Sequence, residues 1–192
     1  MYEFDGEEAK AIREVDVFDT RNIRDEYKDK SHEYIMKHMK RNNLIVVMSN
    51  RIRDFNWGTV VRNANAFGAS KCIFTEKRKY DRRGAVGAYH YTSVEYKKDI
   101  FEVISTYRNL GYTIVAAEYD ENYPMVDINN YQWDEKTVMI FGEEGITLDD
   151  SILRACDVIV KIEMYGTVRS INVGTASGIF MNSFATMYPP QC

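Results

Sequence analysis

The sequence predicts an α/β fold in which helices flank a mostly parallel sheet, and three observations support this prediction. Short apolar runs rich in β-branched residues alternate with segments of helical periodicity, as in parallel sheets joined by helical crossovers. The chain has 192 residues, which suits one domain, and 45% of them are hydrophobic, enough for a substantial core. No internal repeat or low-complexity linker divides the sequence.

Five short apolar runs have the composition expected of strands buried in a sheet. They lie at residues 44–48, 72–75, 112–117, 137–141 and 158–162. Segments with helical periodicity separate them and predict helices at residues 56–67, 99–110, 149–155 and 173–187. Gly68 and Gly111 follow the first two helices and are expected to end them. The last helix is expected to stop before Pro189 and Pro190.

Residues 1–43 are charge-dense and predict an N-terminal helical extension, separate from an α/β domain at residues 44–192. Within the extension, one apolar stripe is formed by Tyr27, Tyr34, Ile35 and Met39. The first residues are acidic and carry no apolar signal core, and no run is long enough to span a bilayer. We therefore expect a cytoplasmic protein with no membrane contact.

Composition limits the kinds of partner and of metal site. The formal net charge is -4 and the isoelectric point is near 5.5, so any contact with nucleic acid must depend on a local basic patch. The chain contains Cys72, Cys156 and Cys192, unevenly spaced and without a CxxC pair. This spacing argues against a disulfide framework or a zinc site built on cysteine pairs, and favours reduced thiols.

The first segment that suggests chemistry spans residues 54–69, where the sequence enters a predicted helix. Asn56 has a side chain suited to cap that helix by accepting from its first free N–H groups. Arg62 follows on an otherwise apolar helix, where a guanidinium needs an anion or carboxylate partner. The alternative for Arg62 is a surface position with its aliphatic stem packed on the protein.

Two further segments follow predicted strands, where ligands of parallel sheets bind. Residues 138–148 contain Gly142, which permits close approach of a ligand to the backbone, and then Glu144; a solvated acidic loop is the alternative. Residues 160–179 contain Ser170 and Asn172, both suited to capping the last helix. The small residues from Gly174 to Gly178 allow another segment to pack closely against that helix.

The three segments together resemble the three motifs of the SpoU or TrmH branch of the SPOUT methyltransferases. The matching patterns are N-x-G-x-x-x-R-x-A-x-A-F-G at 56–68, F-G-x-E-G at 141–145 and I-x-M-x-G-x-V-x-S-x-N-V at 162–173. The resemblance covers roughly residues 44–187. Three positions depart from the family pattern: Thr147 replaces Gly, Glu163 replaces Pro and Gly174 replaces a frequent Ser.

The resemblance implies an α/β fold with a deep C-terminal trefoil knot, a homodimer that uses the last helix, and S-adenosylmethionine as cofactor. It implies methyl transfer to a ribose 2′-hydroxyl of tRNA or rRNA without a metal. The family's cofactor-binding positions are Gly142, Ile162 and Ile171, with Ala117 expected in the same pocket. The implied catalytic residues are Arg62, Asn56, Glu144, Ser170 and Asn172.

The densest basic run spans residues 77–84 and follows the second predicted strand. Its basic residues are Lys77, Arg78, Lys79, Arg82 and Arg83, with Tyr80 between them. Cationic and aromatic groups together suit RNA, although a solvated charged loop is the alternative.

Two other functions stay open from the sequence. One is a knotted methyltransferase that acts on a base nitrogen, and the other is a knotted RNA-binding or assembly factor that does not methylate. A generic nucleotide-binding α/β protein lacks support, because neither GxGxxG nor GxxxxGK[ST] occurs.

Overall fold

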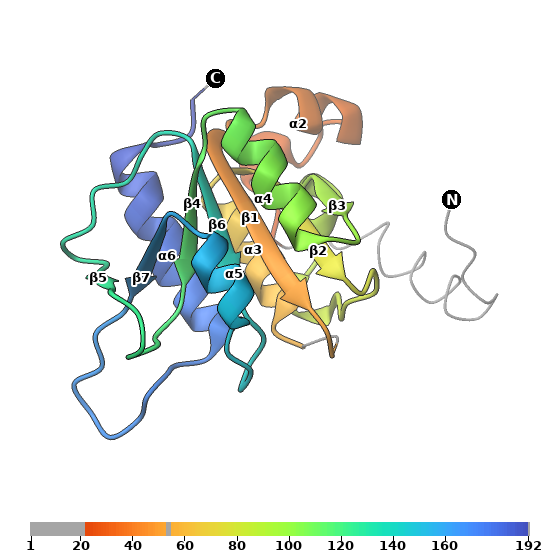
Figure 1. The fold of residues 1–192 in the computed structure, drawn as a ribbon. Helices are drawn as coiled ribbons and strands as arrows, with labels where there is room; N and C mark the ends of the chain where they lie inside the picture. The colour runs from red at the N-terminus through yellow and green to blue at the C-terminus, as the bar shows by residue number, and fades with distance from the viewer. Residues whose placement is uncertain (1–21, 53–54, 192) are drawn as a thin grey trace.

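A computed structural model describes residues 22–52 and 55–191 of the chain (Figure 1). Within these ranges, seven strands form one sheet in the order β3-β2-β1-β6-β4-β7-β5, and every strand pair is parallel. The strands are β1 (Asn42–Asn50), β2 (Ala69–Glu76), β3 (Val94–Tyr96), β4 (Thr113–Ala117), β5 (Val126–Asp127), β6 (Thr137–Phe141) and β7 (Val158–Lys161). The five predicted strands and the mostly parallel sheet are therefore confirmed.

Helices cover both faces of the sheet. They are α2 (His32–His38), α3 (Trp57–Ala66), α4 (Ile100–Asn109), α5 (Asp150–Ala155) and α6 (Val173–Met187), with 3-10 turns η1 (Asp25–Tyr27), η2 (Arg83–Ala85) and η3 (Ala88–Tyr91). Residues of α3 and α6 share one hydrophobic cluster with the sheet, and residues of α4 and α5 share the other. The four predicted helices are confirmed, and Gly68 (φ 70°) and Gly111 (φ 80°) end the first two in the left-handed conformation.

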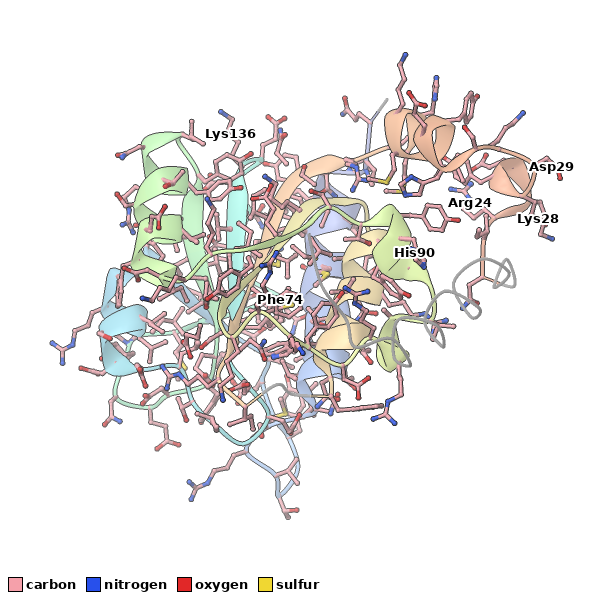
Figure 2. All side chains as sticks on the ribbon, turned by 90° about the vertical axis from the view of Figure 1, so that its right-hand side faces the viewer. Arg24, Lys28, Asp29, Phe74, His90 and Lys136 are labelled. Carbon is pink, nitrogen blue, oxygen red and sulfur yellow. The ribbon has the colours of Figure 1, made fainter. Side chains whose placement is uncertain are left out.

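Strand β1 shows how one run of sequence supplies both cores. Leu44, Val46 and Met48 belong to the α3–α6 cluster, while Ile45 and Val47 belong to the α4–α5 cluster. This split follows from the alternation of side chains along a strand. Because both faces are covered, the run is apolar throughout rather than alternating. Phe74 of β2 lies among the packed side chains between layers (Figure 2).

The N-terminal extension is only partly described, and residues 1–21 lie outside the described residues. Beyond them, η1 and α2 are the helical parts, and Arg41 and His32 bond to the backbone of η3. The predicted apolar stripe is largely wrong: only Ile35 is buried, and Tyr34 is 43% exposed. Helix α2 has seven residues, two turns, which is too short to bury four stripe residues on one side.

The carboxyl ends of the strands, together with the loops that follow them, form one edge of the molecule, at the bottom of Figure 1. Lys136, at the amino end of β6, marks the opposite edge (Figure 2). No helix among the described residues is long and apolar enough to cross a membrane. The trefoil knot stays a prediction, because strand order alone does not show how the chain is threaded.

Candidate functional site

A cavity of about 580 Å³ opens at the carboxyl edge of the sheet, between the loops after β4, β6 and β7. All four residues predicted to bind a cofactor line it: Ala117, Gly142, Ile162 and Ile171. Two of the predicted catalytic residues, Glu144 and Ser170, also line it. The second and third sequence segments therefore meet at this cavity, whereas no described residue of the first segment lines it.

The cavity has both apolar and acidic lining residues. Phe141, Val173 and Phe180 contribute buried or nearly buried apolar surface. Among the described lining residues, the charged ones are Glu118, Asp120, Glu121, Glu143, Glu144 and Arg169. Five carboxylates against one guanidinium favour a ligand with positive charge.

Glu118 fastens the end of β4 to the loop after β6. One carboxylate oxygen accepts from the Leu148 N–H at 3.0 Å and the other from the Tyr119 N–H at 3.0 Å. Burial raises the pKa of the Glu118 carboxyl, and these two N–H donors partly oppose the rise. Gly142 permits the fold-back of this loop, because a Cβ at that position would lie 3.0 Å from the Ile146 carbonyl oxygen.

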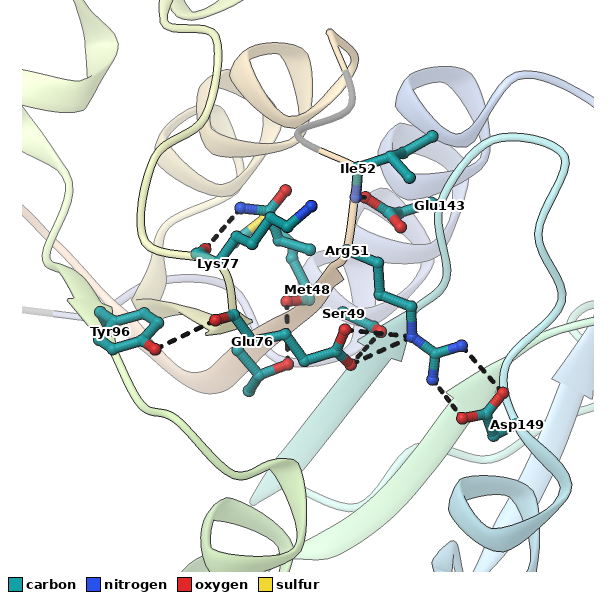
Figure 3. Close-up of polar contacts among 11 residues, drawn as sticks. Met48, Ser49, Arg51, Ile52, Glu76, Lys77, Tyr96, Glu143 and Asp149 are labelled. Carbon is teal, nitrogen blue, oxygen red and sulfur yellow. Dashed lines mark hydrogen bonds and ion pairs between the residues drawn. The ribbon is translucent and has the colours of Figure 1, made fainter.

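The two adjacent glutamates after β6 hold two different segments. Glu144 Oε2 accepts from the Val173 N–H at 2.9 Å and so joins this loop to the start of α6. Glu143 is 5% exposed, and its Oε1 accepts from the Ile52 N–H at 2.6 Å (Figure 3). The alternative interpretation, a solvated acidic loop, therefore does not describe this segment, because both glutamates bond to other parts of the chain.

Asn172 caps α6, as predicted, and also bonds to the first segment. Its Oδ1 accepts from the N–H groups of Gly174 (2.9 Å) and Thr175 (3.3 Å), and its Nδ2 donates to Asn56 Oδ1 at 2.8 Å. The prediction that the Asn56 side chain caps α3 is wrong. Asn56 has helical backbone angles (φ -69°, ψ -17°), whereas a capping side chain needs an extended backbone to reach the free N–H groups. Ser170 lies before Asn172, and the cap of α6 is Asn172 alone.

The small residues of α6 pack closely against α3, as predicted. A Cβ on Gly174 would lie 3.0 Å from Thr59 Cγ2, and one on Gly178 would lie 3.3 Å from Asn63 Nδ2. Asn63 Nδ2 donates to the Gly174 carbonyl oxygen at 2.8 Å and to Ser177 Oγ at 3.0 Å. These bonds fix α3 against the start of α6.

Arg62 projects from α3 as an exposed side chain and does not line the cavity. Within residues 22–52 and 55–191 it forms no hydrogen bond or ion pair, so the predicted carboxylate partner is not found there. The surface alternative describes this structure better. An exposed guanidinium beside an anchored site is nevertheless available to an anion from outside the chain.

The basic run of residues 77–84 packs directly on the first turn of α3. A Cβ on Gly58 would lie 2.7 Å from the Asp81 carbonyl oxygen, and one on Gly84 would lie 2.9 Å from the Thr59 nitrogen. Asn50 Nδ2 holds the start of the run by donating to the carbonyl oxygens of Lys77 and Lys79. Of the five predicted RNA-binding residues, four are exposed, and Arg82 is half-buried with its guanidinium 4.9 Å from the Tyr89 ring centroid.

The departures from the family pattern lie at the margin of the cavity. Ile162 and Met164 line it, whereas Glu163 does not and instead pairs with Lys161 Nζ at 2.5 Å. The negative charge of Glu163 is thereby compensated by the positive charge of Lys161. Thr147 is exposed and lines the cavity.

The sequence did not reveal a network centred on Arg51 (Figure 3). Its guanidinium pairs with Glu76 at the end of β2 (3.1 Å) and with both oxygens of Asp149, the N-cap of α5. These two carboxylates raise the pKa of Arg51 above its ordinary value. The sequence did place Arg51 shortly after one predicted strand and Glu76 just after the next. These two residues become neighbours only because β1 pairs with β2.

Comparisons with known proteins agree with this geometry. Residues 43–182 match the profile described as the SpoU rRNA Methylase family. A mitochondrial rRNA methyltransferase 1 of Dictyostelium discoideum is 27% identical over 67% of this chain, but this chain spans only 26% of that relative. A tRNA (guanosine(18)-2′-O)-methyltransferase of Aquifex aeolicus is 24% identical, over 74% of this chain and 68% of that one.

Solved structures share the fold. The TrmH/SpoU tRNA modifying enzyme of A. aeolicus superposes with a TM-score of 0.71 at 21% identity, covering 82% of this chain and 83% of that chain. The SpoU methyltransferase AviRb of Streptomyces viridochromogenes, in complex with the cofactor AdoMet, gives a TM-score of 0.66 at 20% identity, covering 79% and 60%.

Proposed function

This chain belongs to the SpoU rRNA methylase family, and from that premise we propose that it transfers a methyl group from S-adenosylmethionine to a ribose 2′-hydroxyl of RNA. The observation that carries the proposal is the convergence of the motif segments: the second and third line one cavity, and the first is bonded to the third. Two hydrogen bonds make that convergence specific: Glu144 to the Val173 N–H, and Asn172 to Asn56.

The cavity fits the proposed cofactor in size and in charge. Its volume of about 580 Å³ lies in the usual range for small-molecule sites. Ala117, Ile162 and Ile171 offer apolar surface for the adenosine part, and the surrounding carboxylates favour a net positive ligand. When bound, S-adenosylmethionine supplies a methyl group activated by a sulfonium.

Arg62 has the role of binding and stabilising negative charge on the RNA side. The reacting hydroxyl must lose its proton, but arginine stays protonated and is a poor base. An exposed guanidinium can instead bind the neighbouring phosphate and stabilise charge developing on the ribose oxygen. That phosphate or a water molecule then takes the proton. Asn56, held by Asn172, and Ser170 at the cavity wall position the ribose.

The RNA partner is tRNA or rRNA, bound through Lys77, Arg78, Lys79, Arg82 and Arg83. Their loop packs on the helix that carries Arg62, which supports this assignment. We also propose a homodimer that uses α6, where Ile179 and Met187 are exposed apolar side chains (40% and 39%). A cytoplasmic location remains part of the proposal.

The test is methyl transfer by the purified chain from isotopically labelled S-adenosylmethionine to total RNA, followed by nucleoside mass spectrometry. We expect labelled 2′-O-methyl nucleosides. Label on a base would favour the base-nitrogen methyltransferase. Binding of RNA without any binding of S-adenosylmethionine in calorimetry would favour the non-methylating RNA-binding factor.

A further inference from the structure

Phe55 is a large apolar side chain that is 54% exposed, just before the start of α3. Its neighbours are anchored on both sides: the Ile52 N–H donates to Glu143 (Figure 3), and Asn56 Oδ1 accepts from Asn172. Glu143 lines the cavity, and Asn172 lies two residues after Ser170, which also lines it. Phe55 therefore lies between two residues that bond to the site segments, and it does not line the cavity itself.

Arg83 lies over the Phe55 ring, with its Cζ 5.4 Å from the ring centroid. Its orientation is fixed by Asp81, which accepts from Arg83 Nε at 3.0 and 3.1 Å and from Nη2 at 2.6 Å. The Arg83 side chain is nonetheless 80% exposed. A flat cation that is already oriented and still accessible loses little conformational entropy when a ligand stacks on it.

The pair is also rigidly connected to the helix that carries Arg62. Gly84 follows Arg83 directly and packs against the Thr59 nitrogen of α3 without room for a Cβ. Phe55 precedes the same helix by two residues. Phe55 and Arg83 thus belong to two chain segments that meet at the first turn of α3.

We propose that Phe55 and Arg83 form a stacking platform for an unpaired base of the RNA substrate. The inference rests on the proposed function and narrows its substrate class to RNA in which the target lies in a loop, bulge or single strand. Aromatic rings and guanidinium planes both stack on the faces of bases. A base inside a duplex has both faces covered by its neighbours and cannot use such a platform.

The charge around the platform favours RNA over a second copy of this chain. Lys77, Arg78 and Lys79 are exposed on the same loop as Arg83. They suit the phosphates on either side of a stacked base, whereas this face would repel itself in a symmetric contact between copies.

The test titrates the 192-residue chain with a labelled short single-stranded RNA of mixed sequence and with a duplex of equal length. Phe55→Ala should weaken single-strand binding about tenfold, the order reported for loss of one stacked base. It should leave duplex binding and the salt dependence unchanged, since no phosphate contact is lost. Phe55→Tyr should retain affinity. The matched control is Phe101→Ala, which removes a 42% exposed phenylalanine from α4, on the other face of the sheet.

The possible outcomes separate this inference from the proposed function. Normal methyl transfer by the unaltered chain, with Phe55→Ala binding single strands equally well, would overturn the platform alone. So would an equal loss of duplex binding, or a change in mass by light scattering, which would assign Phe55 to a contact between copies. An unaltered chain that binds neither RNA would overturn both. Calorimetry with S-adenosylmethionine, expected to be unchanged in Phe55→Ala, shows that the variant is folded.

Discussion

The cavity and the basic surface beside it lie on either side of the first turn of α3 and have opposite charge. The charged residues that line the cavity are five carboxylates and one arginine, and backbone N–H groups that donate to Glu118, Glu143 and Glu144 fix its loops. The basic loop offers exposed cations and packs on Thr59, which Gly174 also contacts from the cavity side.

The difference between these regions indicates two ligands of opposite charge. A net cation suits the cavity and a polyanion suits the loop, because each region would repel the other's ligand. The basic loop packs on α3, and Arg62 is the exposed cation on that helix. We propose that the reaction takes place between these two regions, where a substrate phosphate and a cationic cofactor can approach from different sides.

Removing the positive charge of Arg62 should have the largest effect, and the quantity affected is the rate of methyl transfer. Arg62→Ala should lower the rate of methyl transfer about a hundredfold or more, as loss of a group that stabilises transition-state charge does. Cofactor binding should be unchanged, because Arg62 does not line the cavity. Single-turnover transfer and calorimetry measure the two effects. Arg154→Ala, which removes an exposed arginine from α5, is the control, and near-normal transfer by Arg62→Ala would contradict the assignment.

Forcing the basic loop away from α3 should have the next largest effect, which is a loss of unfolding free energy. In Gly58→Ala the new methyl would lie 2.7 Å from the Asp81 carbonyl oxygen and 2.9 Å from the Ala85 and Gly84 nitrogens, so the basic loop must move. Overpacking of this kind costs about 1–3 kcal/mol, more than the helix propensity gained from alanine. Urea unfolding should show the loss. Gly166→Ala is the matched control, since nothing lies within 4 Å of its Cβ position; equal stability of the two variants would refute the tight junction.

Substitutions of Asn172 can separate its two roles, the capping of α6 and the positioning of Asn56. Asn172→Ala loses the bonds to the Gly174 and Thr175 N–H groups and should reduce unfolding free energy by about 1 kcal/mol. Asn172→Asp keeps the acceptor oxygens but cannot donate to Asn56. We expect Asn172→Asp to recover most of the stability and little of the methyl transfer. Recovery of both would assign Asn172 to capping only.

The sequence predicted the parts of the molecule that depend on local pattern. The central strands were found because burial on both faces makes them uniformly apolar, as in β1. Strands β3 and β5 were missed, because three and two residues at the sheet margins carry no such signal. The cavity residues were predicted from the family resemblance, and Asn172 from its type at a helix start.

What the sequence could not provide were contacts decided by which segments become neighbours. The capping role assigned to Asn56 was wrong because its partner, Asn172, lies 116 residues away. The bond from Ile52 to Glu143 spans 91 residues. The Arg51 network depends on β2 and the start of α5 lying beside the end of β1. Such contacts follow from topology rather than from residue type.

The smallest predicted effect is the pH dependence that Glu118 gives to the cavity. Its pKa is raised, chiefly by burial, so its ionised form is present only above a pH higher than usual for glutamate. Ionised Glu118 attracts a net cation, and affinity for S-adenosylmethionine should therefore rise severalfold as pH increases through this pKa. Affinity for S-adenosylhomocysteine, which lacks the sulfonium charge, should change less.

Stability should move in the opposite direction over the same pH range. Because the folded state holds the Glu118 proton more tightly than the unfolded state, its contribution to stability is full below the unfolded pKa and declines as pH rises through the folded one. Glu118→Gln should flatten both the curve of cofactor affinity against pH and the curve of stability against pH. Calorimetric titration and urea unfolding across this range measure them. If the cofactor affinity of Glu118→Gln kept the full pH dependence, Glu118 would not be the group that causes it.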